Sequence, residues 1–286
     1  MNTKEALFYK NTGDTTLQCC LCPQYCSIKD GNAGFCGVRR NYGGKLYTIN
    51  YGKISSLALD PIEKKPLYRY HPGEYILSVG TVGCNLSCQF CQNWNIARDV
   101  SAPTDSVRPE DLIARACDLN SFGIAYTYNE PFIWYEFVYE AAQLAVESGL
   151  ENVLVTNGFV NKEPLEKILP LISAMNIDIK SIEDDFYMNT CSGRVAPVLE
   201  AVKLAARSTH VELTNLVIPT LNDKDENFEK LTDWIYDNLG EDVPLHFSRY
   251  FPSYKMILPP TSELTLIRAK EIAERKLRYV YLGNVR

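Results

Sequence analysis

The stretch Gly83-Cys84-Asn85-Leu86-Ser87-Cys88-Gln89-Phe90-Cys91-Gln92-Asn93 carries three cysteines in a Cys-x3-Cys-x2-Cys pattern, with an aromatic residue directly before the third. Thiolates are soft ligands that suit iron–sulfur clusters or zinc. A [4Fe–4S] cluster normally takes four thiolates, so three protein ligands leave one iron open to another ligand. The apolar stretch from Tyr75 to Gly80 precedes this pattern and predicts a strand. We therefore expect the three cysteines on the loop that follows a strand.

Three other interpretations of this pattern stay open at this point. The cysteines also fit a structural zinc knuckle, a ferredoxin-type cluster whose fourth cysteine lies elsewhere, or three unrelated buried thiols.

A second group of cysteines lies nearer the N-terminus. Cys19, Cys22, Cys26 and Cys36 follow a Cys-x2-Cys-x3-Cys-x9-Cys pattern among glycines and a proline, with Cys20 as a spare. Four thiolates close a coordination sphere, so this pattern predicts a structural metal site. Its occupant is either zinc or a saturated auxiliary [4Fe–4S] cluster, and the alternative is a reduced thiol cluster with no metal.

Composition restricts the partners and the compartment. The 286 residues include 29 Lys and Arg and 35 Asp and Glu, a net charge of −6, which gives no electrostatic reason to expect nucleic acid or a membrane surface as partner. No apolar run approaches the roughly 18 residues of a membrane span, and residues 1–10 lack the apolar core of a signal peptide. Ten cysteines in two groups indicate metal binding in a reducing compartment, so we expect a cytoplasmic protein.

From Tyr75 onward, strand and helix patterns alternate. The expected strands are 75–81, 123–129, 152–158, 174–180, 211–218 and 244–251, and the expected helices are 108–120, 132–148, 162–172, 195–207, 224–239 and 261–275. This alternation predicts an α/β fold with a parallel sheet, and six units predict an open, partial (β/α)6 barrel over residues 74–286. Residues 1–73 are expected to form a Cys-rich extension with a β-hairpin of 45–51 and 53–59 around Gly52.

In such barrels the chemistry collects at the C-terminal ends of the strands. The residues there with polar side chains are Glu130, Thr156, Asn157, Asp178, Lys180, Asn215 and His246. Asp178 and Lys180 are two positions apart and therefore point to one face of their strand. His246 is alternatively a satisfied core histidine, and Thr156 and Asn157 are alternatively part of an ordinary turn before Gly158. Cys117 is expected in the core of its helix.

The cysteine loop after the first strand resembles the cluster loop of radical S-adenosylmethionine (SAM) enzymes, which share the partial barrel. In that family the open iron binds the amino and carboxylate groups of SAM, so the resemblance implies a [4Fe–4S] cluster on Cys84, Cys88 and Cys91. The family places a Gly-Gly-Glu-like motif after the second strand. Here the segment is Tyr128-Asn129-Glu130-Pro131. Both glycines are replaced, but Glu130 remains available to pair with the SAM ammonium, or alternatively to cap the next helix.

The resemblance also implies roles for the other strand ends. Thr156 and Asn157 lie where the family binds ribose or the methionine carboxylate. Glycyl-radical activating enzymes carry an Asp-x-Lys pattern that lines the SAM and substrate region, as Asp178 and Lys180 do here; the alternative is a buried salt bridge. Asn215 and His246 are candidates for contact with SAM or substrate.

Seven separated segments resemble one clade, the radical SAM component of the AmmeMemoRadiSam system, which is related to pyruvate formate-lyase activating enzymes. The matching segments are Cys19–Pro23, Gly34–Arg39, Asp60–Pro66, Gly83–Trp94, Thr127–Pro131, His246–Arg249 and Tyr279–Asn284. Members often continue into a Cys-x2-Cys tail, which is not present before Arg286. The clade implies partner proteins of the Memo and AMMECR types.

The implied reaction is the reductive cleavage of SAM to a 5′-deoxyadenosyl radical, which abstracts hydrogen from an unidentified substrate. The electron comes from a donor such as flavodoxin or ferredoxin. Two alternatives remain open: a glycyl-radical-enzyme activase that acts on a protein partner, and a non-catalytic iron–sulfur electron carrier or zinc module. Three cluster cysteines with polar groups at several strand ends favour the enzyme, because a carrier needs full cluster ligation.

Overall fold

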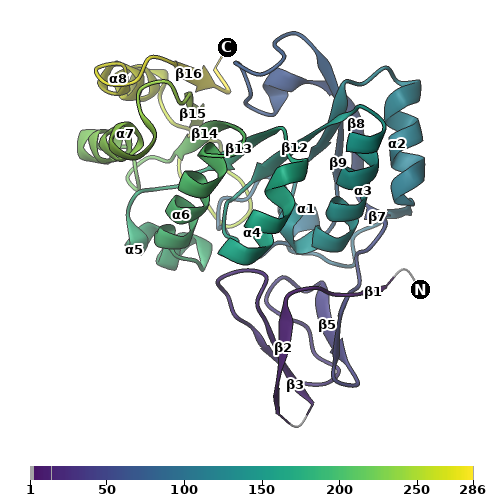
Figure 1. Cartoon of the computed structure of the whole chain (residues 1–286). Coiled ribbons are helices and arrows are strands. Elements are labelled where there is room, and N and C mark those ends of the chain that lie inside the picture. The colour runs from purple at the N-terminus through teal and green to yellow at the C-terminus, as the bar shows by residue number, and fades with distance from the viewer. Residues whose placement is uncertain (1–2, 14, 286) are drawn as a thin grey trace.

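The computed structural model describes residues 3–13 and 15–285. Figure 1 shows a large body of sheet and helices from which an N-terminal extension of short strands projects at one end. In the described part of the chain, no helix is both long and apolar enough to cross a membrane.

The body is built on an eight-stranded sheet. Its order is β16-β15-β14-β13-β12-β11-β9-β8, in which all neighbours are parallel except β8 and β9. The strands are β8 (Ser56–Pro61), β9 (Tyr75–Gly80), β11 (Gly123–Tyr126), β12 (Glu151–Thr156), β13 (Ala174–Asp178), β14 (His210–Val217), β15 (Leu245–Arg249) and β16 (Val280–Gly283). The order has two free edges, so the barrel is open.

Crossover helices cover one face of this sheet (Figure 1). They are α2 (Pro109–Asp118), α3 (Tyr135–Glu147), α4 (Lys162–Ile168), α6 (Val195–Ala206), α7 (Asp225–Leu239) and α8 (Glu263–Ala273). Each turns an apolar stripe inward; in α3 it includes Phe137, Ala141 and Ala145, all fully buried. The strands they cover are largely buried on both faces, as expected of a parallel sheet.

The predicted α/β partial barrel with a Cys-rich extension is confirmed, with two differences in detail. The sequence pattern indicated six parallel strands, but β16 is a seventh, paired with β15. It was missed because it has only four residues and follows α8 without a long apolar run. Cys117 is exposed rather than in the core, because Ile113 and Ala116 face inward and turn it outward.

The predicted hairpin of 45–51 and 53–59 is wrong. The first segment, β6 (Lys45–Thr48), pairs instead with β5 (Arg39–Tyr42) across Gly43 and Gly44, whose φ values of +59° and +78° suit a tight two-residue turn. The second segment contributes β8, which pairs antiparallel with β9. The predicted boundary between residues 73 and 74 therefore falls between two paired strands, and the division into two domains stays a prediction.

The extension consists of two small sheets joined to the body. One sheet holds β1 (Lys4–Glu5), β6 and β5, and the other holds β2 (Tyr9–Gly13), β3 (Thr16–Cys19) and β4 (Ser27–Ile28). Arg39 is buried and its Nη1 donates to both carboxylate oxygens of Glu136 on α3 at 3.1 Å. A buried pair of this kind leaves an uncompensated charge when one partner is removed, so it fixes the extension to the body strongly.

A glycine in the cysteine loop brings the two parts closest together. Gly83 has φ +94°, and a Cβ there would lie 2.8 Å from the Cys36 carbonyl oxygen and 2.9 Å from Cγ1 of Val38. Both atoms belong to the extension. The loop after β9 and the extension therefore pack directly on each other, and only glycine fits both the conformation and the space.

We expect Gly83→Ala to destabilise the chain more than Gly149→Ala does. Gly149 has φ +75°, but a Cβ at this position would meet nothing within 4 Å, so it reports the cost of the left-handed conformation alone. The excess at Gly83 measures the clash with the extension, on the order of 1–3 kcal/mol. Urea unfolding of both variants checks this, and equal losses would show that the extension yields without cost.

Candidate active site

The three cysteines after β9 open into a cavity at the C-terminal ends of the parallel strands. Its volume is about 330 Å³, within the size range of small-molecule sites. Every strand from β9 to β15 in the main sheet contributes to it, either directly or through the loop that follows. The residues that carry polar or sulfur groups into its wall are Lys64, Lys65, Cys84, Cys88, Cys91, Gln92, Asn93, Thr127, Tyr128, Asn129, Glu130, Thr156, Asn157, Asp178, Lys180, Thr214, Ser248 and Asn284.

The thiols of the cysteine loop are mostly enclosed. Burial raises the pKa of Cys84 well above its ordinary value and also raises that of Cys91. For Cys88 the largest cause of a raised pKa is a hydrogen bond with the thiol of Cys191, followed by burial. Cys191 itself is buried in a π-helical turn, η4 (Tyr187–Cys191), behind the loop. Metal binding at these cysteines therefore has to release their protons.

Two asparagines hold the cysteine loop against neighbouring strand ends. Asn129, after β11, donates from Nδ2 to the carbonyl oxygen of Gly83 at 2.8 Å and accepts from the Thr81 amide at 3.1 Å. Asn157, after β12, donates from Nδ2 to Oδ1 of Asn85 at 3.0 Å and to Sγ of Cys84 at 3.7 Å. An N–H directed at a cluster sulfur is one of the means by which proteins adjust cluster potentials.

Glu130 joins the ends of β11 and β12. It is buried, and its carboxylate accepts from the Phe132 amide at 3.0 Å, the Thr156 hydroxyl at 2.8 Å and the Asn157 amide at 2.8 Å. Burial raises the pKa of Glu130 to about 7, although these hydrogen bonds and Lys180 act in the opposite direction. Glu130 thus caps the 3₁₀ turn η2 (Pro131–Trp134) and also faces the cavity.

Asp178 and Lys180 lie side by side in the cavity wall, on one face as their spacing predicts. Nζ of Lys180 donates to Oδ2 of Asp178 at 2.9 Å, and Lys180 Nζ also lies 5.9 Å from the centre of the Phe90 ring. Burial alone would lower the pKa of Lys180, but the negative charge of Asp178 and the nearby cysteines raise it well above its ordinary value. The lysine therefore presents a permanent positive charge beside the cysteine loop.

Sequence reasoning missed a group of three residues at the same wall. Oδ2 of Asp60, at the end of β8, accepts from Nζ of Lys65 at 2.9 Å and from the Tyr128 hydroxyl at 2.9 Å. Tyr128 stands where the resembling family has glycine, and it keeps the left-handed conformation at φ +70°. The hydrogen bond to Asp60 and the Lys65 ammonium 4.9 Å from its ring offset that strain. The sequence signal that could have pointed to this group is the segment from Asp60 to Pro66, one of the seven segments that resemble the clade.

The structure does not bring Asn215 or His246 to this cavity. Asn215 is buried and donates from Nδ2 to the Ile179 carbonyl oxygen at 2.8 Å, so it supports the chain beneath Lys180. His246 lies at the other end of its strand, where Nε2 is 2.6 Å from Oε2 of Glu212 and its ring packs on Tyr68 and Tyr281. His246 is therefore placed as a hydrogen-bonded core histidine. The residue of β15 that lines the cavity is Ser248.

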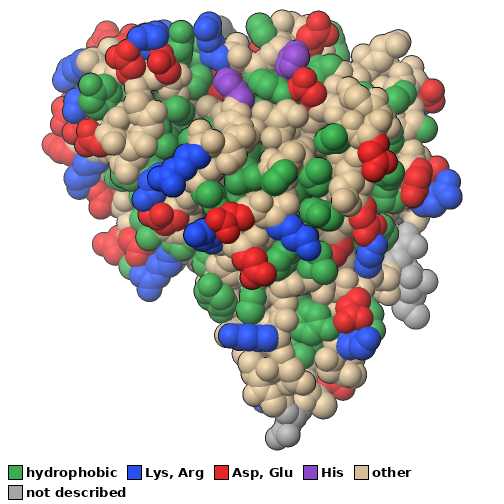
Figure 2. All heavy atoms as spheres, in the orientation of Figure 1, with side chains coloured by type: hydrophobic (Ala, Val, Ile, Leu, Met, Phe, Trp, Pro, Cys, Tyr) green, Lys and Arg blue, Asp and Glu red, His purple; other side chains and the backbone are tan. Residues whose placement is uncertain are grey.

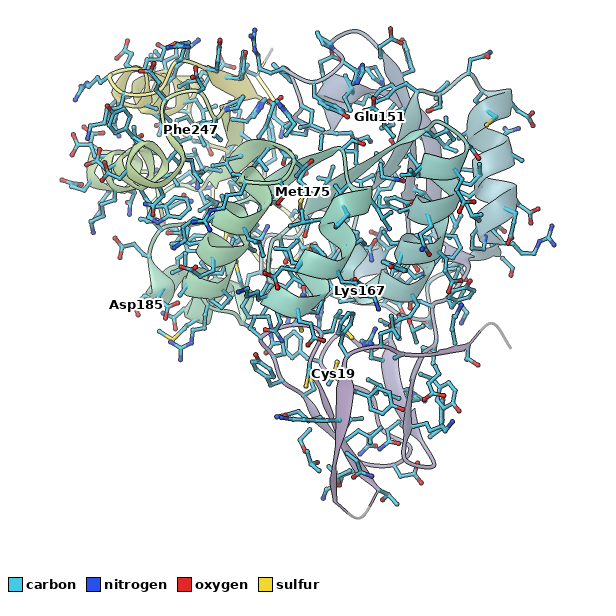
Figure 3. The ribbon with its side chains drawn as sticks, in the orientation of Figure 1. Cys19, Glu151, Lys167, Met175, Asp185 and Phe247 are labelled. Atoms are coloured by element: carbon cyan, nitrogen blue, oxygen red, sulfur yellow. The ribbon has the colours of Figure 1, made fainter. Side chains whose placement is uncertain are left out.

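The N-terminal cysteines line a separate, small cavity. Cys19, Cys22, Cys26 and Cys36 all face it. Figure 3 shows Cys19 where the extension meets the body and Glu151, at the start of β12, toward the opposite end. The extension therefore sits on the side where the parallel strands end.

The donor set at the large cavity fits an iron–sulfur cluster with one open position. Three thiols on one loop face a space that also holds a carboxylate and a cation, Glu130 and Lys180. Within residues 3–13 and 15–285, no three His, Cys, Asp or Glu side chains are already arranged around a common metal position.

Residues 78–235 match the family model described as the radical SAM superfamily. The chain belongs to this superfamily of enzymes, which implies a [4Fe–4S] cluster and SAM as cofactors. It is 45% identical to an uncharacterized protein of Methanocaldococcus jannaschii, over 99% of this chain and 85% of that protein. It is 26% identical to the pyruvate formate-lyase-activating enzyme of Clostridium pasteurianum, over 54% of this chain and 66% of that protein.

Solved structures show the same fold. A radical SAM methyltransferase from Sphaerobacter thermophilus aligns with a TM-score of 0.58 at 14% identity, over 98% of this chain and 76% of that one. QueE from Escherichia coli aligns with a TM-score of 0.51 at 12% identity, over 81% of this chain and 93% of that one. At such identities the likeness concerns the fold alone.

The buried Glu212 beneath the cavity predicts a pH dependence of stability. Burial alone would raise its pKa, but hydrogen bonds from His210, His246 and the amides of Tyr68 and Arg69 lower it to about 2. A depressed pKa in the folded state adds stability above the unfolded value near 4.5 that is lost as the pH falls towards 2. This contribution is about 3 kcal/mol.

We expect Glu212→Gln to lower the free energy of unfolding at neutral pH and to flatten its pH dependence between about 2 and 4.5. Urea unfolding of the cluster-free chain across this range measures both effects. Glu147→Gln, at an exposed position on α3, is the control. An unchanged slope in Glu212→Gln would contradict the assignment of this acid sensitivity to Glu212.

Proposed function

We propose that this chain cleaves SAM reductively at a [4Fe–4S] cluster held by Cys84, Cys88 and Cys91, and that its substrate binds in the same cavity. When bound, the cluster and SAM would supply a 5′-deoxyadenosyl radical that abstracts hydrogen from the substrate. The observation that carries this proposal is that three thiols, a buried carboxylate and a cation face one cavity of about 330 Å³.

Glu130 is proposed to bind the ammonium group of SAM. A carboxylate offers about four acceptor positions, and protein donors occupy three of them. Glu130 itself lines the cavity, so we propose that the remaining position on Oε2 accepts from the ammonium group. Thr156 and Asn157 are proposed to hold this carboxylate and the polar part of SAM, since both line the cavity. Asn157 also contacts Cys84, which supports a role in aligning SAM with the cluster.

Asp178 and Lys180 are proposed to line the region shared by SAM and substrate. Their ion pair lies beside Cys88 and Phe90, and it is partly open to the cavity. For Asn215 and His246 we propose a supporting role, because their hydrogen bonds are made to protein groups away from the cavity.

The finer assignment rests on sequence resemblance. We propose that the chain is the radical SAM component of an AmmeMemoRadiSam system, that Memo-type and AMMECR-type proteins are its partners, and that flavodoxin or ferredoxin supplies its electron. The ten cysteines, none of which is in a disulfide among the described residues, support a reducing compartment, the cytoplasm. Figure 2 shows Lys and Arg interspersed with Asp and Glu over the visible face, so no single-sign patch there favours a nucleic-acid partner.

A second candidate is activation of a glycyl-radical enzyme. Relatives named pyruvate formate-lyase-activating enzyme support it, as does the Asp178–Lys180 pair at the position where such enzymes carry Asp-x-Lys. The open edge of the barrel is compatible with a protein substrate.

Glu130→Gln should weaken SAM binding by about tenfold or more, because the negative partner of the ammonium is lost. Thr156→Val is the matched control: it removes one donor to Glu130 but keeps the carboxylate. We expect a smaller loss of affinity in the control. Equilibrium dialysis with anaerobically reconstituted protein measures both, with iron content and unfolding midpoint to verify the fold. Wild-type affinity in Glu130→Gln would remove Glu130 from the SAM site.

Anaerobic reconstitution, dithionite reduction and mass spectrometry for 5′-deoxyadenosine test the function directly. We expect product from the wild type and from Cys117→Ser, an exposed cysteine outside the cavity. The Cys84/Cys88/Cys91→Ala variant should lose both the cluster iron and the product. A wild type that is fully reconstituted and binds SAM, yet yields no product, would favour a carrier or structural module instead.

The activase candidate is tested in the same samples. Incubation with purified glycyl-radical enzymes should produce a protein radical by electron paramagnetic resonance if that candidate is correct. SAM cleavage without any protein radical would contradict the activase candidate and favour a small-molecule substrate.

A further inference from the structure

We propose that Cys19, Cys22, Cys26 and Cys36 bind a single divalent metal ion, Zn²⁺ or Fe²⁺, in place of a four-iron cluster, and that this ion stiffens the loop that carries Cys84. The proposal does not depend on SAM chemistry. It concerns a second site, outside the cavity described above.

The fold brings the four cysteines together from three short segments. Cys19 ends β3, Cys22 and Cys26 lie in the turn before β4, and Cys36 precedes β5. A backbone hydrogen bond from the Cys19 amide to the Cys26 carbonyl oxygen, 3.0 Å long, closes the turn. All four side chains face one cavity. Closed tetrathiolate sites of this spacing are typical of structural metal ions.

A backbone amide is already directed at one of the sulfurs. The Phe35 amide donates to Sγ of Cys26 at 3.2 Å. Charge-assisted hydrogen bonds of this type become stronger once the sulfur is a thiolate. The Phe35 amide is therefore placed to stabilise the Cys26 thiolate once a metal ion has displaced the thiol proton.

The small volume of the cavity favours the smaller of the two possible occupants. Its volume is about 10 Å³, which is room for one water-sized body. A metal ion fits such a space after the thiols turn toward it, whereas a cube of four irons and four sulfides does not. The described side chains do not yet surround a metal position, and this holds equally for Cys84, Cys88 and Cys91.

A buried arginine supplies a hydrogen-bond donor to such a site. One divalent ion with four thiolates carries a net charge of −2, and burying that charge is costly unless the sulfurs receive hydrogen bonds. Arg39 is 1% exposed and lines this cavity. Its Nη1 binds Glu136, but its Nε is buried and has no hydrogen-bond partner among the described residues. A thiolate in the cavity is the acceptor that this N–H lacks.

The site is connected to the cysteine loop of the large cavity. Asn85, next to Cys84, also lines the small cavity. Gln24, between Cys22 and Cys26, donates from Nε2 to the carbonyl oxygens of Asn85 at 2.9 Å and Ser192 at 2.8 Å. Together with the contact of Gly83 on Cys36, these bonds make the extension one wall of the cluster loop. An ion that fixes the turn should therefore fix the loop.

Metal stoichiometry in the full chain tests the proposal. The Cys84/Cys88/Cys91→Ala background removes the first site, so any remaining metal belongs to the second. After anaerobic incubation with Zn²⁺ or with iron and sulfide, followed by dialysis, we expect one ion per chain and no sulfide. Adding Cys22→Ser or Cys36→Ser should abolish binding. Adding Cys20→Ser should not, because that neighbouring thiol lies outside the cavity.

Cobalt absorption provides an independent readout, since tetrahedral thiolate ligation of Co²⁺ gives intense bands that Cys20→Ser should retain and Cys22→Ser should lose. Circular dichroism verifies that each variant is folded. If Cys22→Ser does not fold, Cys36→Ser is used in its place. Absence of metal from the folded background, or about four irons with sulfide per chain, would overturn the single-ion site.

The link to the loop is tested by hydrogen exchange in the same background. Zn²⁺ should slow exchange of amides in 81–93 by about tenfold, which corresponds to about 1.4 kcal/mol. The Cys22→Ser variant should show no such response. Equal exchange with and without bound Zn²⁺ would overturn the proposed stiffening of the loop. The single-ion site is tested separately by the metal stoichiometry.

Discussion

The buried carboxylate of Glu130 is the interaction on which the rest of the site depends. It takes hydrogen bonds from its own turn, from Thr156 at the end of β12 and from Asn157, which follows that strand. Because these donors are buried, losing the carboxylate would leave several of them unsatisfied. Asn157 then carries the same network to the cysteine loop. Two strand ends and the loop of a third are thus held in one arrangement by the chain's own hydrogen bonds.

Regular periodicity made the body of the fold predictable, because buried parallel strands and amphipathic crossover helices each leave a strong pattern. The three loop cysteines were equally visible, since thiol spacing is local. Side-chain direction was predictable for Asp178 and Lys180 from their two-residue spacing. For these features the local sequence carries all the information that is needed.

The features that the sequence did not predict depend on contacts between segments that are far apart in the chain. Residues 53–59 had a hairpin pattern, but Ser56–Pro61 pairs with β9 because the apolar edge of the main sheet competes with the local turn. The position of a side chain along its strand was also not predictable: His246 was a candidate for contact with SAM or substrate, but it lies at the end of β15 where Glu212 accepts its hydrogen bond. The group of Asp60, Lys65 and Tyr128 joins segments about 65 residues apart and leaves no periodic signal.

The unpaired side of β16 has a consequence for how the two ends of the sheet are joined. The sheet order ends at β16 on one side, and Asn284, directly after this strand, lines the large cavity. In a closed barrel the first and last strands share backbone hydrogen bonds, whereas β8 and β16 are not neighbours in this sheet. The two ends meet instead through side chains: Tyr68, in the segment after β8, packs on Tyr281 of β16, and Arg69 packs on Tyr279. Side-chain contacts of this kind can separate without breaking any backbone pairing, which a closed barrel does not allow.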